Sequence, residues 1–248
     1  MANTKRPYSA VRFYLPNIIL GVLILIIFLV LSTAVVFRVK DIEVKGSTIY
    51  SDALIEDMVL NDKYKYNGLY DVIKSRFFPS KNVPFVEKIS VRLSGNHKLV
   101  IEVREKALRG YTIDSKDRYV YFDGNIKVTQ ISDQLIDGLI PVEGLTIEDA
   151  AEGEYLPVQS SRRKALAVVY KNIKSRDITA DRIIIDETDG TITMVSGEIT
   201  VMLGNKTNLE EKLRRLSYIL PKLEKKSGTL HLEDFTEENT DIVFKETK

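Results

Sequence analysis

The sequence of 248 residues contains no cysteine and only two histidines, His97 and His231. Without cysteine there is no disulfide framework and no thiolate chemistry, so the fold must be stabilised by its cores. Two histidines that share no H-x-x-H spacing do not provide the ligands of a zinc site. Residues 204–207 (GNKT) lack the glycine spacing of a phosphate loop. We therefore predict no metal and no cofactor.

A nucleophile motif is also missing. There is no G-x-S-x-G elbow. The carboxylates Asp186, Glu187 and Asp189 fall at a predicted strand end and turn, where acidic side chains are commonly solvated. We predict a non-enzymatic protein without a small-molecule substrate. The alternative is a membrane-anchored extracytoplasmic hydrolase that uses an acidic residue or a histidine as its general base.

The sequence has no excess of basic residues. Lys plus Arg (36) and Asp plus Glu (35) nearly balance, and Lys5, Arg6 and Arg12 lie in a segment, residues 1–17, that contains no acidic residue. The rest of the chain is slightly acidic and lacks the basic surface that neutralises phosphates, so we predict no nucleic-acid partner. With 44% apolar and 29% charged residues, the chain has the composition of a folded protein.

What the sequence does contain is a long apolar run. Residues 18–37 (IILGVLILIIFLVLSTAVVF) carry no charge, and as a helix they match the roughly 30 Å hydrocarbon core of a bilayer. The hydroxyls of Ser32 and Thr33 can bond back to their own helix. We predict a transmembrane helix over 18–37, with the lipid bilayer as its partner.

The charges that flank the run predict its orientation. The basic tail, residues 1–17, should stay in the cytoplasm and the long C-terminal part should be translocated, although Arg38 and Lys40 reduce the charge difference. A cleaved signal peptide is the alternative. The run exceeds the roughly 7–15 residues of a signal core, and no A-x-A-like site follows it. We predict a single-pass protein of the cell membrane.

Residues 38–106 have the pattern of a small module. A strand is predicted at 39–46 and a hairpin with a Gly-Asn turn at 89–103. Between them lie two predicted helices, the first capped by Ser51 and the second following Asn67. Their apolar positions are Leu54, Ile55, Met58 and Val59 in the first helix and Leu69, Val72, Ile73 and Phe77 on one face of the second. This order predicts both helices on one face of a three-stranded sheet.

Residues 107–244 are predicted to be rich in strands. Three consecutive strands at 182–203 are separated by turns and should form an antiparallel meander. A helix is predicted at 161–173, and Thr207 with Glu210 forms a capping box that should open another helix. The fold class is therefore α+β, with one N-terminal transmembrane helix, a strand-helix-helix-strand-strand module and a β-rich domain with packed helices.

Two closing strands are predicted at 228–232 and 241–244, joined by an acidic segment, 233–240. A terminal strand at a sheet edge leaves N–H and C=O groups that can pair with an incoming strand. The candidate partner-binding residues are the apolar residues of this region, Leu230, Leu232, Phe235, Ile242, Val243 and Phe244. The alternative is that they complete the core.

Several stretches resemble the FtsQ/DivIB family of bacterial cell-division proteins. They are VKDIEVKGS after the apolar run, FVEKISVRLSGNHKLVIEVREKAL across the predicted hairpin, RYVYFDGNIKV followed by IPVEGL, and VMLGNKTNLEEKLRRLSYIL. The last is similar to the family's V-x-L-G…L-x-x-K-L-x-x-L pattern, matched at Leu203, Gly204, Leu209, Lys212, Leu213 and Leu216. The order of these stretches is that of the family.

The resemblance implies a fold and a function. It implies that residues 38–106 form a POTRA module and residues 107–244 a β domain, followed by a short tail, 245–248. It also implies a scaffold at the division septum that binds FtsL and FtsB (DivIC) and thereby supports septal cell-wall synthesis, with the partner-binding region at the end of the β domain. A secreted, chaperone-like POTRA protein is the remaining alternative.

Overall fold

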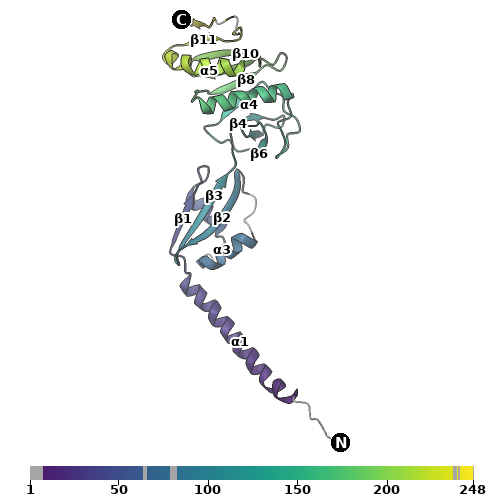
Figure 1. Ribbon diagram of the computed structural model, residues 1–248, viewed down its shortest axis with the longest axis vertical. Coiled ribbons are helices and arrows are strands. Elements are labelled where there is room, and N and C mark those ends of the chain that lie inside the picture. Colours follow the sequence, from purple (N-terminus) through teal and green to yellow (C-terminus); the bar gives the residue numbers. More distant parts are fainter. Residues whose placement is uncertain (1–7, 64–65, 79–82, 237–238, 240, 248) are drawn as a thin grey trace. The chain divides into compact units, whose positions relative to one another are not determined.

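A computed structural model describes residues 8–63, 66–78, 83–236, 239 and 241–247. Residues 1–7 of the predicted tail, Glu237, Glu238 and Thr240 of the acidic segment, and Lys248 lie outside the described residues. The chain divides into two compact units, residues 1–105 and 106–248. Both contain helices and strands (Figure 1).

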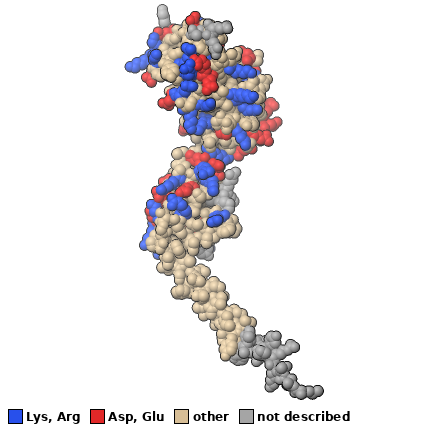
Figure 2. All heavy atoms as spheres, viewed as in Figure 1, with Lys and Arg blue, Asp and Glu red and all other residues tan. Residues whose placement is uncertain are grey.

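The first helix, α1, runs from Tyr8 to Val36. It contains the predicted span, residues 18–37, except for the last residue of that span. Its apolar part, Tyr14–Val36, has 23 residues and is therefore about 35 Å long. Figure 2 shows no charged side chain along Tyr14–Val36. The Ser32 and Thr33 hydroxyls donate to backbone carbonyls of the preceding turn, as predicted. Helix α1 is long and apolar enough to cross a membrane.

The rest of the first unit is a three-stranded sheet with two helices among its described residues. The elements are β1 (Asp41–Lys45), α2 (Asp52–Val59), α3 (Gly68–Phe77), β2 (Val86–Ser94) and β3 (Lys98–Glu105). The strand order is β1-β3-β2, with β3 parallel to β1 and antiparallel to β2. The predicted order of elements and the predicted hairpin are confirmed.

The two helices begin where the sequence predicts. The Ser51 hydroxyl accepts a hydrogen bond from the Leu54 N–H, and the Asn67 side chain accepts one from the Tyr70 N–H. These side chains act as N-caps for the first turns, and the Leu54 N–H is shared between the hydroxyl and the carbonyl of Ser51. The core beneath is apolar and includes the fully buried Ile101 at the centre of β3.

The predicted apolar face of α3 is partly wrong. Val72 packs against the core, but Ile73 and Phe77 are 49% and 69% exposed. Helix α3 is rotated about its axis relative to the predicted orientation, and Gly68 explains this rotation. A Cβ at residue 68 would lie only 2.5 Å from Leu93 Cδ2. The missing side chain lets the start of α3 approach β2 closely, which turns Ile73 and Phe77 outward.

Asp71 lies on the buried face of α3 with 2% of its surface exposed, and neither carboxylate oxygen has a hydrogen-bond partner among the described residues. Burial, and secondarily the negative charge of Asp62, raise the pKa of this carboxyl to about 7. The folded protein therefore holds this proton more tightly than the unfolded chain does. The free energy of unfolding should fall as pH rises from about 4 to about 7, and stay low at higher pH.

We expect Asp71→Asn to raise the free energy of unfolding of the first unit by about 2 kcal/mol at alkaline pH, because it removes an unpaired buried charge and keeps the shape. The decline of stability with rising pH should largely disappear. Urea unfolding of residues 38–248 over a pH series measures both effects. Asp57→Asn changes an exposed carboxylate on α2 and is the matched control. The same pH profile in all three proteins would contradict the titration of a buried Asp71.

The described residues of the second unit form a sheet of nine strands in the order β12-β11-β10-β9-β8-β7-β4-β5-β6. Its strands are β4 (Gly110–Ile113), β5 (Tyr119–Phe122), β6 (Val128–Ser132), β7 (Ile140–Glu143), β8 (Arg182–Ile185), β9 (Ile192–Ser196), β10 (Ile199–Gly204), β11 (Gly228–His231) and β12 (Val243–Glu246). Its helices are α4 (Ser160–Ser175), α5 (Leu209–Ile219) and the short 3-10 helix η1 (Leu220–Leu223).

Helices α4 and α5 pack against each other and share one core with the sheet (Figure 1). Residues along β9 and β10 alternate between buried and half-buried, as expected for a sheet covered on one face. The predicted meander is confirmed, since β8, β9 and β10 pair consecutively and antiparallel. Strands β4 and β7 were not predicted, and β7 joins the two halves of the sheet through parallel pairing with β4 and β8.

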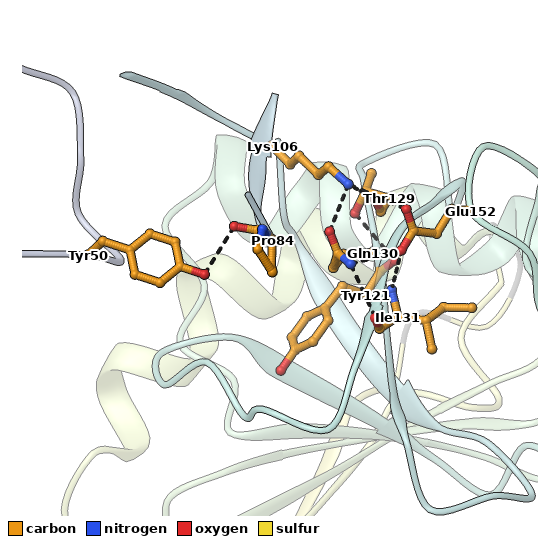
Figure 3. A network of polar contacts seen from close by, with 8 residues as sticks. All are labelled: Tyr50, Pro84, Lys106, Tyr121, Thr129, Gln130, Ile131 and Glu152. Carbon is orange, nitrogen blue, oxygen red and sulfur yellow. Dashed lines mark hydrogen bonds and ion pairs between the residues drawn. The ribbon is translucent and has the colours of Figure 1, made fainter. Parts of the chain in front are cut away.

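A polar network fixes the start of the second unit to its sheet (Figure 3). The Lys106 ammonium donates to the Thr129 carbonyl and to Gln130 Oε1, both at 2.8 Å. Glu152 Oε1 accepts from the Gln130 side-chain amide at 2.8 Å and from the Ile131 N–H at 3.0 Å. The first residue of the unit is thereby tied to β6 and to the loop that carries Glu152.

Candidate partner-binding edge of the large sheet

Strand β12 forms one end of the large sheet. It pairs antiparallel with β11, and no other described strand lies on its outer side. The predicted closing strand is therefore an edge strand among the described residues, and it extends to Glu246, two residues beyond its predicted end. An edge strand presents backbone groups that a strand from another chain can pair with.

The pairing of β12 shows which of these groups point outward. The Thr247 N–H donates to the Ser227 carbonyl at 2.8 Å. In an antiparallel pair, successive residues point their N–H and C=O groups alternately toward and away from the neighbouring strand. The backbone groups of Val243 and Lys245 therefore face β11, and those of Phe244 and Glu246 face away from the sheet.

The side chains of residues 242–244 also alternate between the core and the surface. Ile242 and Phe244 pack against the core, and Val243 is 49% exposed. Lys226 Nζ lies 5.9 Å from the centre of the Phe244 ring. Among the candidates Ile242, Val243 and Phe244, Val243 is the one whose side chain is exposed and available to a partner.

The remaining candidates belong to the core. Leu230, Leu232 and Phe235 are 1%, 0% and 2% exposed. Strand β11 lies between β10 and β12, and Leu230 and Leu232 belong to the core that the sheet shares with α4 and α5. The Arg215 guanidinium lies 4.5 Å above the Phe235 ring. These three side chains are buried in this structure, and their contact with a partner stays a prediction.

Two residues of the family-like pattern hold the edge in place. Lys212 is 1% exposed, and its ammonium donates to the Leu203 carbonyl at 2.8 Å and to the Glu233 carbonyl at 2.9 Å. Burial lowers the pKa of this amine. Gly204 has a φ of +70°, and a Cβ there would lie 2.9 Å from Glu233 Cα. The end of β10 and the segment that leads to β12 are thus fastened together.

The capping box predicted at Thr207 is wrong. Helix α5 begins at Leu209 with Asn208 as its N-cap, in a left-handed conformation and without a side-chain cap. The Thr207 N–H donates to Asn205 Oδ1 at 2.8 Å, so this stretch forms a turn before the helix. The turn follows Gly204, where the backbone has a positive φ. A T-x-x-E pattern gives no information about this backbone conformation.

We expect Gly204→Ala to lower the free energy of unfolding of the second unit by about 2 kcal/mol, because the new Cβ meets the Glu233 backbone and the φ is positive. Gly153→Ala is the matched control, since Gly153 has a φ of +85° but no atom within 4 Å of its ideal Cβ. The control should lose less stability. Equal losses in urea unfolding would show that the close approach of Glu233 contributes nothing.

Each histidine has a partner within its own unit. His97 Nδ1 lies 2.9 Å from the Arg38 carbonyl oxygen, and His231 Nδ1 lies 2.6 Å from Glu233 Oε1 in the other unit. No group of three or more His, Asp or Glu side chains that could hold a metal occurs within the described part of the chain. Neither a scan against protein-family models nor a search of curated proteins finds a match to this chain.

Proposed function

We propose that this protein is a bitopic scaffold of the bacterial division machinery, similar to the FtsQ/DivIB family. Helix α1 anchors it in the cell membrane with its N-terminus in the cytoplasm, and both folded units act outside the cytoplasm. At the septum, the second unit binds partner ectodomains of the FtsL and FtsB/DivIC type and supports septal wall synthesis. The protein itself carries out no catalysis in this proposal.

The observation that carries the proposal is the edge strand β12. Its outward backbone groups, at Phe244 and Glu246, provide a template for β-strand addition. The pattern residues Gly204 and Lys212 support this edge through Glu233, which gives the family-like pattern a physical role. The β1-α2-α3-β2-β3 order of the first unit fits the POTRA module that the resemblance implies.

The test is capture of tagged FtsL-type and FtsB/DivIC-type proteins by the full chain in detergent-solubilised membranes. Deletion of residues 241–248 should abolish capture. Because Ile242 and Phe244 pack against the core, circular dichroism and urea unfolding must show that the second unit stays folded in the deletion variant. Capture at unchanged affinity by a folded deletion variant would contradict the proposal.

A further inference from the structure

We infer that the outer face of α3, formed by Ile73, Phe77 and the adjoining Phe78, lies in the lipid–water interface beside α1. This inference rests on the proposed insertion of α1 in the membrane and goes beyond it. It assigns a second membrane contact to the first unit, made by a helix that lies on the bilayer surface.

Exposed apolar side chains gather at α3. Ile73, Phe77 and Phe78 are 49%, 69% and 75% exposed. Outside α1, the exposed large apolar residues described in the first unit are Leu54, Tyr66, Tyr70, Ile73, Phe77 and Phe78, and all except Leu54 lie on α3 or at its ends. A contiguous patch of this kind marks an interaction surface, whereas single exposed apolar residues do not.

The spacing of these residues makes α3 two-sided. Ile73 and Phe77 are four residues apart and therefore lie above one another on the same face of the helix. Gly68 and Asp71 are buried, and Val72 packs against the core. One face of α3 is thus used by the sheet, and the other presents apolar and aromatic side chains outward.

The start of α3 is hydrogen-bonded to the chain that leaves the predicted span. The Gly68 N–H donates to the Phe37 carbonyl at 2.9 Å, and the Val39 N–H donates to the Tyr66 carbonyl at 2.8 Å. Arg38 and Asn67 also form an isolated β-bridge. Since α1 ends at Val36, the first residue of α3 lies one hydrogen bond from the membrane exit.

The length of α3 keeps the whole patch near that exit. At about 1.5 Å per residue, Phe77 lies only about 14 Å along the helix from Gly68. The nearest large apolar phase is therefore the bilayer that contains α1, and this proximity identifies lipid as the occupant of the patch. Aromatic side chains are favoured at the level of the headgroups.

The polar groups of α3 suit the same position. Lys74 and Arg76 lie in its last turn and can face lipid phosphates. Asp62 accepts a hydrogen bond from the Tyr70 hydroxyl at 2.9 Å and pairs with Lys74 at 2.8 Å. The Asp62 carboxylate is thereby paired beside α3, which lowers the cost of bringing this helix to the interface.

The absence of cysteine from the chain allows a direct test with single labels. Phe77→Cys, Lys88→Cys and Phe28→Cys are each labelled with the environment-sensitive fluorophore NBD in the full chain. The proteins are reconstituted in vesicles of phosphatidylethanolamine and phosphatidylglycerol, with and without lipids that carry a doxyl quencher near the headgroup or deep in the acyl chain. Lys88 is an exposed control in the same unit, on β2, and Phe28 reports insertion of α1.

We expect the label at position 77 to show a blue-shifted emission and strong quenching by the shallow doxyl lipid, and the label at position 88 to show neither. Ile73→Cys should behave like Phe77→Cys. Quenching at position 28 but not at 77 or 73 would overturn the inference and leave the anchor intact. A blue shift at 77 without lipid quenching would mean that a protein surface covers α3, and would also overturn it. Loss of quenching at position 28 would overturn the membrane anchor itself.

Discussion

Replacing Glu246 by proline is expected to weaken capture of the proposed FtsB/DivIC-type partner by a factor between about 5 and about 150. The substitution removes an outward N–H from β12 and leaves a partner carbonyl unpaired, which costs about 1–3 kcal/mol. The inward ladder should survive, since the backbone groups of Val243 and Lys245 pair with β11. Proline is tolerated on an edge strand when its nitrogen faces away from the sheet. The equilibrium dissociation constant, measured by biolayer interferometry, gives the result.

Two controls separate the backbone from the side chain. Glu246→Ala removes only the carboxylate and its 3.5 Å ion pair with Lys226, and exposed pairs of this kind contribute little. It should bind like the parent protein. Val243→Ala should weaken binding more than Phe244→Ala in variants that stay folded, because Val243 is exposed and Phe244 faces the core. Unchanged affinity in Glu246→Pro would rule out strand addition at this edge.

Features that depend on a few neighbouring residues could be predicted from the sequence. Ser51 and Asn67 cap their helices because a single side chain and a single N–H decide the cap. The apolar run that forms α1 required only length and the absence of charge. The β2–β3 hairpin followed from alternation on both sides of a Gly-Asn turn.

Features that depend on distant segments could not be predicted. Strands β4 and β7 have four residues each, and β7 contains Pro141, so neither shows an alternating pattern long enough to recognise. The rotation of α3 depends on the contact of Gly68 with Leu93, which lies on a strand that follows later in the chain. Periodicity alone placed Ile73 and Phe77 in the core.

The candidate site also combines features that neighbouring residues determine with features that distant segments determine. The sequence left open whether the last predicted strand lies at a sheet edge or completes the core, and the structure places β12 at the edge of the described sheet. The burial of Leu230 and Leu232 depends on the parallel pairing of β11 with β10. Helix α5 lies in the connection between these two strands, and a sequence pattern does not reveal this crossover connection. The role of Lys212 required the two carbonyls that its ammonium reaches.

We expect Ile101→Asp to unfold the first unit. Ile101 is fully buried at the centre of β3, opposite Val44 on β1 and Val91 on β2, so the new carboxylate would have neither water nor a positive partner. Burying such a charge costs several kcal/mol, which is comparable to the whole stability of a small domain. Urea unfolding of residues 38–248 should lose the transition of the first unit and keep that of the second.

Arg104→Asp is the matched control for this substitution, because it places the same side chain on the same strand at an exposed position that points away from the helices. It should change the free energy of unfolding by no more than about 0.5 kcal/mol. If Ile101→Asp unfolded like the control, the inward register of β3 would be wrong by one residue. Simultaneous loss of both transitions in Ile101→Asp would instead show that the second unit depends on the first for its stability, in contradiction to the separate cores of the two units.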